Sequence, residues 1–272
     1  RLVALAIAIG GWALVAHRRA LPRGRELLAL VAFGVLGIAV LQWTATEAIA
    51  RMDAGVMLTF VYSASITTAL FSRLVWKERQ PPAVWVAMVV TLVGLALAVG
   101  IGGDALGSTP RAGIAFAVAT SMLFAYYALH GARLLARHPM PVVLGVGATA
   151  ATLVWGTTAA PLWAFPFGEV AGELSLGGRI EATTAPGILM LGGSMAVGTI
   201  LPYVLYLVGM GRVGPTLGVI TGTMEPIVAV ILSWIWLDQR LEPLQIVGCV
   251  LVIGAVVLVQ VARATPDGEG TA

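Results

Sequence analysis

Residues 215–237 read PTLGVITGTMEPIVAVILSWIWL, a run long enough to cross a hydrocarbon core of about 30 Å as a helix. Glu225 lies near the middle of this run, and no other formally charged residue lies near the middle of an apolar run in the chain. A charged side chain at the centre of a bilayer costs about 2.5–3.5 kcal/mol on insertion scales. The position of Glu225 therefore indicates a candidate functional site.

Similar apolar runs flank this one along nearly the whole chain, which has 272 residues, 59% of them hydrophobic and 11% charged. Because an ordinary soluble domain carries about 25% charged residues, this composition predicts an all-α polytopic membrane protein. The first run is short and the chain opens on Arg1 rather than Met, so we expect that a preceding helix is missing. The predicted spans in this chain are Leu2 to Ala16, Leu27 to Ile49, Ala54 to Trp76, Ala83 to Ile101, Gly113 to Ala132, Val142 to Ala164, Pro186 to Val208, Pro215 to Leu237 and Leu244 to Ala262, nine in all.

Basic residues are unevenly distributed between the two sets of loops. Cytoplasmic loops of membrane proteins are enriched in Lys and Arg, so the richer set is predicted to face the cytoplasm, together with the C-terminal tail. Arg strongly outnumbers Lys, a composition typical of GC-rich bacteria, and we expect a bacterial inner membrane. Of the 16 basic residues, eleven fall on the predicted cytoplasmic side: Arg18, Arg19, Arg23, Arg25, Arg73, Lys77, Arg79, Arg133, Arg137, Arg212 and Arg263.

A weak internal repeat relates the two halves of the chain. A shift of 161 residues aligns Arg51 with Arg212 and Pro82 with Pro243, with apolar runs and loops in step between them. Equivalent spans are five crossings apart, so they cross the membrane in opposite directions, an arrangement typical of secondary carriers. We predict residues 1–104 as a first repeat with four spans, residues 105–264 as a second with five, and residues 265–272 as a disordered cytoplasmic tail.

Polar and small residues share one face of the Glu225 helix. Thr221, Gly222 and Glu225 fall within one arc at 100° per residue, which suits a substrate path between helices. Pro226 removes a backbone donor and is expected to kink this helix. The alternative is that these small residues only pack against a neighbouring helix, with a kink at Pro226 and with Glu225 paired to that neighbour.

Two further stripes of side chains are candidates for the same path. Pro202 is expected to bend the helix that carries one of them. Tyrosines can stack on a substrate and donate hydrogen bonds, but ordinary packing and interface anchoring are equally common roles. The candidate residues are Thr199, Tyr203 and Tyr206 in the second half, and Tyr62 and Ser65 in the first.

Two side chains are candidates for proton coupling. Removal from water favours the protonated form of a carboxyl, so Glu225 would hold a proton when the path is closed and release it when the path is wet. His130 is the second candidate, although its position near a helix end is more typical of an interfacial histidine.

Several classes of chemistry lack support in the sequence. No Gly-rich phosphate loop of the Walker type is present, so we expect no ATP. Three His and one Cys do not form a convincing metal site, and we expect neither a metal nor another cofactor. The expected partners are a small-molecule substrate and the lipid bilayer, with no nucleic acid. The oligomeric state is not set by the sequence, which is compatible with a monomer.

The second half resembles the drug/metabolite transporter superfamily in its EamA-type branch. The first half shows a similar pattern of residues in Trp76-Lys77-Glu78-Arg79, Trp85 and Gly94. The chain departs from the family in having Asp238-Gln239 where a Glu usually follows the ninth helix. The residues that carry the resemblance are Pro215, Glu225-Pro226, Trp234, Trp236, Leu241-Glu242-Pro243-Leu244, Gly248 and Gly254.

This resemblance implies ten helices arranged as two inverted five-helix repeats, with both termini in the cytoplasm. It also implies export or exchange of small metabolites, often amino acids, without ATP. We therefore expect a secondary active transporter that works by alternating access, and no enzyme. The alternatives are a non-transporting membrane scaffold and an intramembrane serine protease, for which Ser121 and His130 on one predicted helix are the available pair.

Overall fold

A computed structural model of the chain describes residues 1–52, 54–75, 77, 81–98, 110–158, 172–175, 183–237 and 242–264. Several sequence predictions fall outside these ranges. They concern the boundary between the repeats near residue 104, the 265–272 tail, the motif residues Trp76, Glu78 and Arg79, and the loop residues Asp238 to Leu241.

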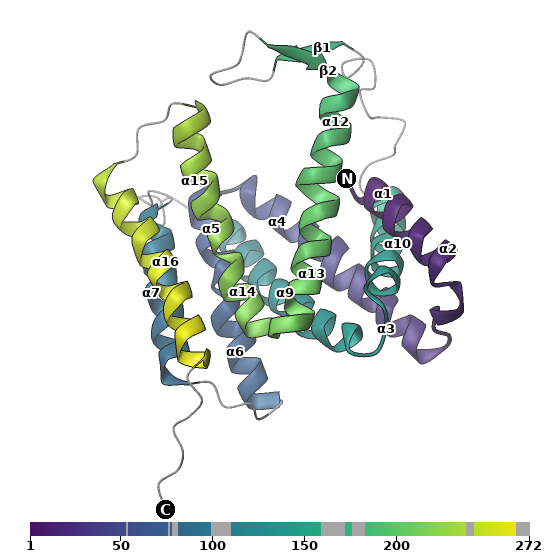
Figure 1. Ribbon diagram of the computed structural model, residues 1–272, viewed down its shortest axis with the longest axis horizontal. Helices are drawn as coiled ribbons and strands as arrows, with labels where there is room; N and C mark the ends of the chain where they lie inside the picture. Colours follow the sequence, from purple (N-terminus) through teal and green to yellow (C-terminus); the bar gives the residue numbers. More distant parts are fainter. Residues whose placement is uncertain are drawn as a thin grey trace, which may run out of the picture.

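The part of the first half that the structure describes is helical, with one helix for each predicted span (Figure 1). Two of these helices contain a π-helical turn, and one is broken at Ser63. The elements are α1 (Leu2–Leu5), the π-turn η1 (Ala6–Gly10), α2 (Gly11–Ala16), the short 3-10 turn η2 (Arg18–Ala20), α3 (Arg25–Gly34), the π-turn η3 (Val35–Val40), α4 (Leu41–Ile49), α5 (Ala54–Tyr62), α6 (Ala64–Val75) and α7 (Pro82–Ala98).

The second half has the same character, with a π-turn in one helix and a break at Thr223 in another. Pro215 and Pro243 stand at the first positions of helices, where a missing backbone donor is harmless. The elements are α9 (Arg111–Leu135), α10 (Met140–Thr158), the strands β1 (Glu173–Ser175) and β2 (Thr184–Pro186), α12 (Gly187–Met195), the π-turn η6 (Ala196–Ile200), α13 (Leu201–Val213), α14 (Pro215–Gly222), α15 (Met224–Leu237) and α16 (Pro243–Ala264).

The two strands are an addition to the all-α prediction. They pair antiparallel, with Leu174 opposite Ala185, at the end of α12 where that helix projects from the bundle (Figure 1). Their side chains are largely exposed and they contribute nothing to the core. The described part of the chain is therefore a helical bundle with a small antiparallel strand pair.

The helices have the lengths and surfaces of membrane spans. Within the described residues, five helices are long and apolar enough to cross a bilayer: Arg25–Ile49, Arg111–Leu135, Met140–Thr157, Gly187–Val213 and Pro215–Leu232. Shorter apolar helices cover 2–16, 82–98 and 243–258, and the break at Ser63 divides the remaining span. Large apolar side chains such as Val15 and Leu74, 88% and 70% exposed, cover the outside. This surface suits lipid and not water.

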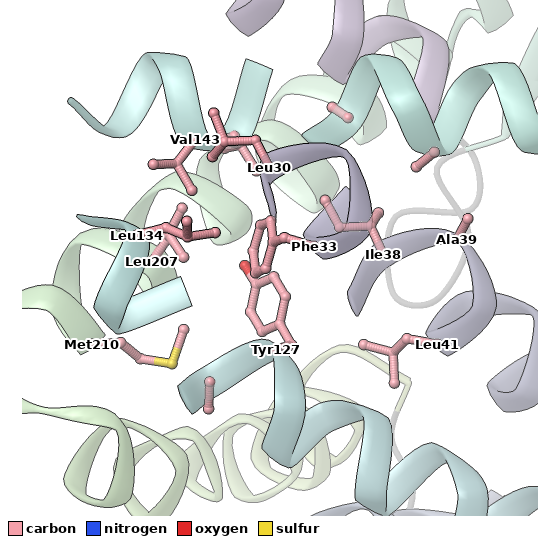
Figure 2. Close-up of a cluster of buried hydrophobic side chains, with 14 of the residues drawn as sticks. Leu30, Phe33, Ile38, Ala39, Leu41, Tyr127, Leu134, Val143, Leu207 and Met210 are labelled. Atoms are coloured by element: carbon pink, nitrogen blue, oxygen red, sulfur yellow. The ribbon is translucent and has the colours of Figure 1, made fainter. Parts of the chain in front are cut away.

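The largest core cluster joins helices from both halves of the chain. The rings of Phe33 and Tyr127 stack with centroids 5.2 Å apart at its centre. Figure 2 shows Leu134, Leu207 and Met210 on one side of this pair and Ile38 and Leu41 on the other. The pair therefore ties α3 and α9 to α13.

Glycines allow three pairs of helices to approach closely. A Cβ at Gly34 would collide with the backbone of Gly147, and one at Gly145 would lie 3.0 Å from the Cα of Gly10. The third crossing joins α7 and α16, where a Cβ at Gly94 would lie 2.9 Å from the carbonyl oxygen of Gly248. Small residues at helix crossings are the usual means of tight packing within a membrane.

The α7–α16 crossing yields a prediction for stability. Gly248→Ala places a methyl group against the backbone of Ala98 and Gly94, and we expect it to destabilise the fold by about 1–3 kcal/mol. Gly254→Ala on the same helix meets nothing within 4 Å and is the matched control. The measurement is the apparent unfolding temperature in detergent. Equal unfolding temperatures for the two variants would contradict the close crossing.

Candidate functional site

Two helices are interrupted, one in each half of the chain. The Ser63 hydroxyl donates to the carbonyl of Phe60 at 2.6 Å, and the Thr223 hydroxyl donates to the carbonyl of Ile220 at 2.6 Å. Both breaks thus use the same local hydrogen bond from residue i to residue i−3. The Thr223 break also lies three residues before Pro226, whose ring cannot donate and disfavours a helical carbonyl at Gly222.

A side-chain hydrogen bond joins the two interrupted helices. The hydroxyl of Tyr62, the last residue of α5, donates to Oε2 of Glu225 at 3.0 Å. Glu225 is the second residue of α15, directly after the Thr223 break. Tyr62 is only 4% exposed, whereas Glu225 is exposed, so the carboxylate faces accessible space while its donor comes from the protein interior.

Tyr206 of α13 approaches the same point through Gly222. A Cβ at Gly222 would lie 3.0 Å from Cε2 and 3.3 Å from the hydroxyl oxygen of Tyr206, so only glycine leaves this space free. The Tyr206 hydroxyl is sealed from solvent and has no hydrogen-bond partner within the described residues. Thr221, on the same helix, is exposed. Helices α5, α13 and α14–α15 therefore converge at Glu225.

An aromatic layer extends from Tyr206 into the bundle. Its ring stacks on Phe124 with centroids 5.7 Å apart, and the rings of Tyr127 and Tyr203 form an edge contact at 6.3 Å. Phe124 was not among the sequence candidates. It lies one turn before Tyr127 on α9, and that spacing was the only available signal for it.

The remaining path candidates are buried in this conformation. Ser65 is fully buried and its hydroxyl donates to the Tyr62 carbonyl at 2.9 Å. Its side chain therefore does not line an open path in this conformation. Thr199 lies in η6, 4% exposed, and its hydroxyl has no partner among the described residues. Pro202 is exposed and is the second residue of α13, which follows the π-turn η6.

His130 lies away from this convergence point. The hydroxyl oxygens of Ser63 and Ser121 are 3.0 Å apart, so the break between α5 and α6 lies beside Ser121 of α9. His130 is further along the same helix by about 14 Å, at 1.5 Å per residue. It stacks on Tyr126 with centroids 4.2 Å apart. Ser121 therefore has Ser63 and not His130 beside it, which removes the geometry required by the protease alternative.

Electrostatics leave Glu225 without a cation in the part of the chain that the structure describes. Ion pairs there join Glu47 with Arg51 and Glu26 with His138, the latter at 3.9 Å. No group of three or more His, Cys, Asp or Glu suits a metal ion within these residues. The site is thus an accessible carboxylate held by one tyrosine, which can accept a proton or bind a cationic group.

Comparisons with known proteins match this architecture. The profile of the EamA-like transporter family matches residues 1–100 and 111–261. A solved crystal structure superposes with a TM-score of 0.72 at 19% sequence identity, covering 97% of this chain and 88% of the other, which is a similarity of fold.

Characterised and uncharacterised bacterial transporters are similar in sequence. The uncharacterized transporter YdfC of Bacillus subtilis is 27% identical over 237 residues, 87% of this chain and 72% of that protein. The threonine/homoserine exporter RhtA of Escherichia coli K12 is 27% identical over 203 residues, 74% of this chain and 60% of that protein. RhtA of Salmonella typhimurium is 28% identical over the same length.

The family match covers both halves of the bundle and both interrupted helices. It agrees with the apolar spans, with the lipid-facing surface and with the resemblance noted in the sequence. The chain is a multi-pass membrane protein, and it belongs to the EamA-like transporter family.

Proposed function

We propose that this protein is a secondary active transporter that exports or exchanges small metabolites, amino acids among them, by alternating access. One observation carries the proposal: the hydrogen bond from Tyr62 to Glu225 joins the residue before one helix break to a residue directly after the other. Interrupted helices at corresponding positions of two halves are the usual location of a carrier's substrate site. The exporter RhtA is the reason for naming amino acids.

Matching irregularities support the proposed repeats at residues 1–104 and 105–264. The π-turns η3 and η6 begin at Val35 and Ala196, which are 161 residues apart, as in the alignment of the two halves. In Figure 1, α5 and α6 descend whereas α14 and α15 rise, as inverted halves require. Core contacts of α7 with α16 place Leu95 beside Cys249 and Val84 beside Val256, so this pair also runs antiparallel.

In this proposal the two breaks act as hinges around Glu225. A protonated Glu225 has lost its charge, and the carboxyl can then leave accessible space as the path closes. A wet path stabilises the carboxylate, which accepts the hydrogen bond from Tyr62. Transport of the substrate is thereby coupled to movement of a proton.

The proposed orientation in a bacterial inner membrane rests on charge. Arg18, Arg19 and Arg23 are exposed in the connection between α2 and α3, and Arg25 is exposed at the start of α3. We assign this connection to the cytoplasm together with the C-terminus. A scaffold remains the alternative from another class. It would bind no solute and exchange none across a membrane.

Solute counterflow tests the transport activity itself. Proteoliposomes loaded with unlabelled L-threonine or L-homoserine should take up the labelled amino acid faster than empty proteoliposomes, since exchange requires a shared site. Thermal-shift screening against further amino acids and small metabolites extends the search to other substrates, because a bound ligand raises the apparent stability of the protein. If no counterflow and no stabilising ligand are found, the result would favour the scaffold.

Glu225→Gln should remove proton coupling. The amide keeps the size of the side chain but cannot ionise, so we expect uptake driven by a pH gradient to fall to the level seen without a gradient. Counterflow at equal pH would persist if substrate binding survives. Glu242→Gln, an exposed carboxyl at the start of α16, is the control. Unchanged gradient-driven transport in Glu225→Gln would exclude the coupling role.

Tyr62→Phe should weaken transport while leaving the fold intact. The change removes only the hydroxyl that donates to Glu225, and a hydrogen bond to a charged group contributes about 1.5–3 kcal/mol. We expect transport to fall about tenfold or more, measured as the initial rate of counterflow. Tyr126→Phe is the matched control, because Tyr126 stacks on His130 away from the convergence point. Equal rates for both variants would contradict the role of the Tyr62 bond.

A further inference from the structure

An apolar groove of about 660 Å³ lies at the other side of the molecule from the α7–α16 pair (Figure 1). It is bounded by η1 and α2 of the first helix, by the α3–η3 helix and by α10. Its floor is the close crossing of Gly10 with Gly145, and its rim includes Ile7, Leu14 and Leu153, which are 71%, 60% and 65% exposed.

The groove has almost no means of binding water. Thr149 is the one lining residue with a polar side chain, and its hydroxyl already donates to the carbonyl of Gly145 at 2.8 Å. A site must offer several polar partners to hold an ordered water molecule. The groove therefore suits a flexible hydrocarbon chain, and it is open on the face that large apolar side chains present to the membrane.

One end of the groove meets a cluster of positive charge. Leu21 lines the groove and lies in the connection between α2 and α3. That connection also carries Arg18, Arg19 and Arg23, all exposed, and no ion pair in the described part of the chain involves them. Arg25 follows at the start of α3. Basic clusters beside apolar clefts at a membrane surface attract anionic lipid headgroups.

We infer that this groove is a binding site for an anionic phospholipid, such as phosphatidylglycerol. One acyl chain lies in the groove between η1 and α10, and the phosphate lies against the arginines of the α2–α3 connection. A long apolar groove with positive charge at one end matches the acyl chain and the anionic headgroup of such a lipid. The inference does not depend on the transported substrate or on the role of Glu225.

Native mass spectrometry of the full-length protein tests the site. Purified protein is offered equal amounts of phosphatidylglycerol and phosphatidylcholine with identical acyl chains, and the retained lipid is counted. We expect phosphatidylglycerol to be retained in excess by about tenfold or more, since each arginine near the headgroup contributes roughly a factor of five. Replacing Arg18, Arg19 and Arg23 by Gln should remove the preference and leave retention of phosphatidylcholine unchanged.

A second variant tests the acyl groove without altering charge. Gly11 lines the groove, and a Cβ at this position meets nothing within 4 Å, so we expect Gly11→Leu to occupy part of the groove with a larger apolar side chain. Retention of both lipids should fall in this variant. Gly254→Leu, equally free of contacts, is the control for the groove. The double change of Arg73 and Arg212 to Gln, both exposed at other helix ends, is the control for charge.

Three outcomes would overturn the inference. Equal retention of the two lipids by the unaltered protein removes the headgroup preference. Unchanged lipid retention in Gly11→Leu removes the groove as the location. A dimer of the unaltered protein that dissociates in Gly11→Leu shows that a second copy of the chain occupies the groove instead.

Discussion

Every backbone N–H and C=O within a bilayer must find a partner inside the protein, and the irregular parts of this structure follow from that constraint. At the two helix breaks, the hydroxyls of Ser63 and Thr223 donate to the carbonyls of Phe60 and Ile220, which also accept the backbone N–H groups of the same two residues. At the π-turn η3, Nε1 of Trp155 donates to the Ala39 carbonyl at 3.1 Å. Side chains thus add hydrogen bonds at both breaks and at the π-turn η3.

The same constraint explains why the polar site is located at the breaks. A break in a lipid-facing helix would expose backbone groups to hydrocarbon, so breaks are tolerated only where protein or water covers them. Glu225 follows one break directly, and its partner Tyr62 precedes the other. The carboxylate therefore lies where the backbone already requires a polar environment, and the cost of placing an acid at this depth is reduced.

The sequence was informative about the membrane spans and about the side chains that meet at the candidate site. It was less informative about irregular backbone. Hydropathy located the helix ends that the structure describes to within about three residues, except that α13 continues to Val213 beyond the predicted end at Val208. The predicted ends at Trp76, Ile101 and Ala164 lie outside the described residues. Glu225, Tyr62, Tyr206 and Gly222 were identified by residue type and helical phase, and the structure brings these four together. The break at Ser63 has no proline beside it, and the strand pair lies in a polar loop, so neither left a clear signal. Phe124 was missed because an aromatic residue in an apolar helix is usually ordinary packing.

Rigid and flexible contacts are segregated in this bundle. The close crossings at Gly94–Gly248, Gly34–Gly147 and Gly10–Gly145 bring backbones into contact, and in the proposed transport cycle we expect those helix pairs to move as units. Between these units, α5–α6 and α14–α15 are interrupted, and the hydrogen bond from Tyr62 to Glu225 joins them. In the proposed mechanism, a change in the state of that carboxyl acts on the segments whose helices are interrupted. Proton binding at one atom would in this way alter the relation of whole helix pairs without disturbing their internal packing.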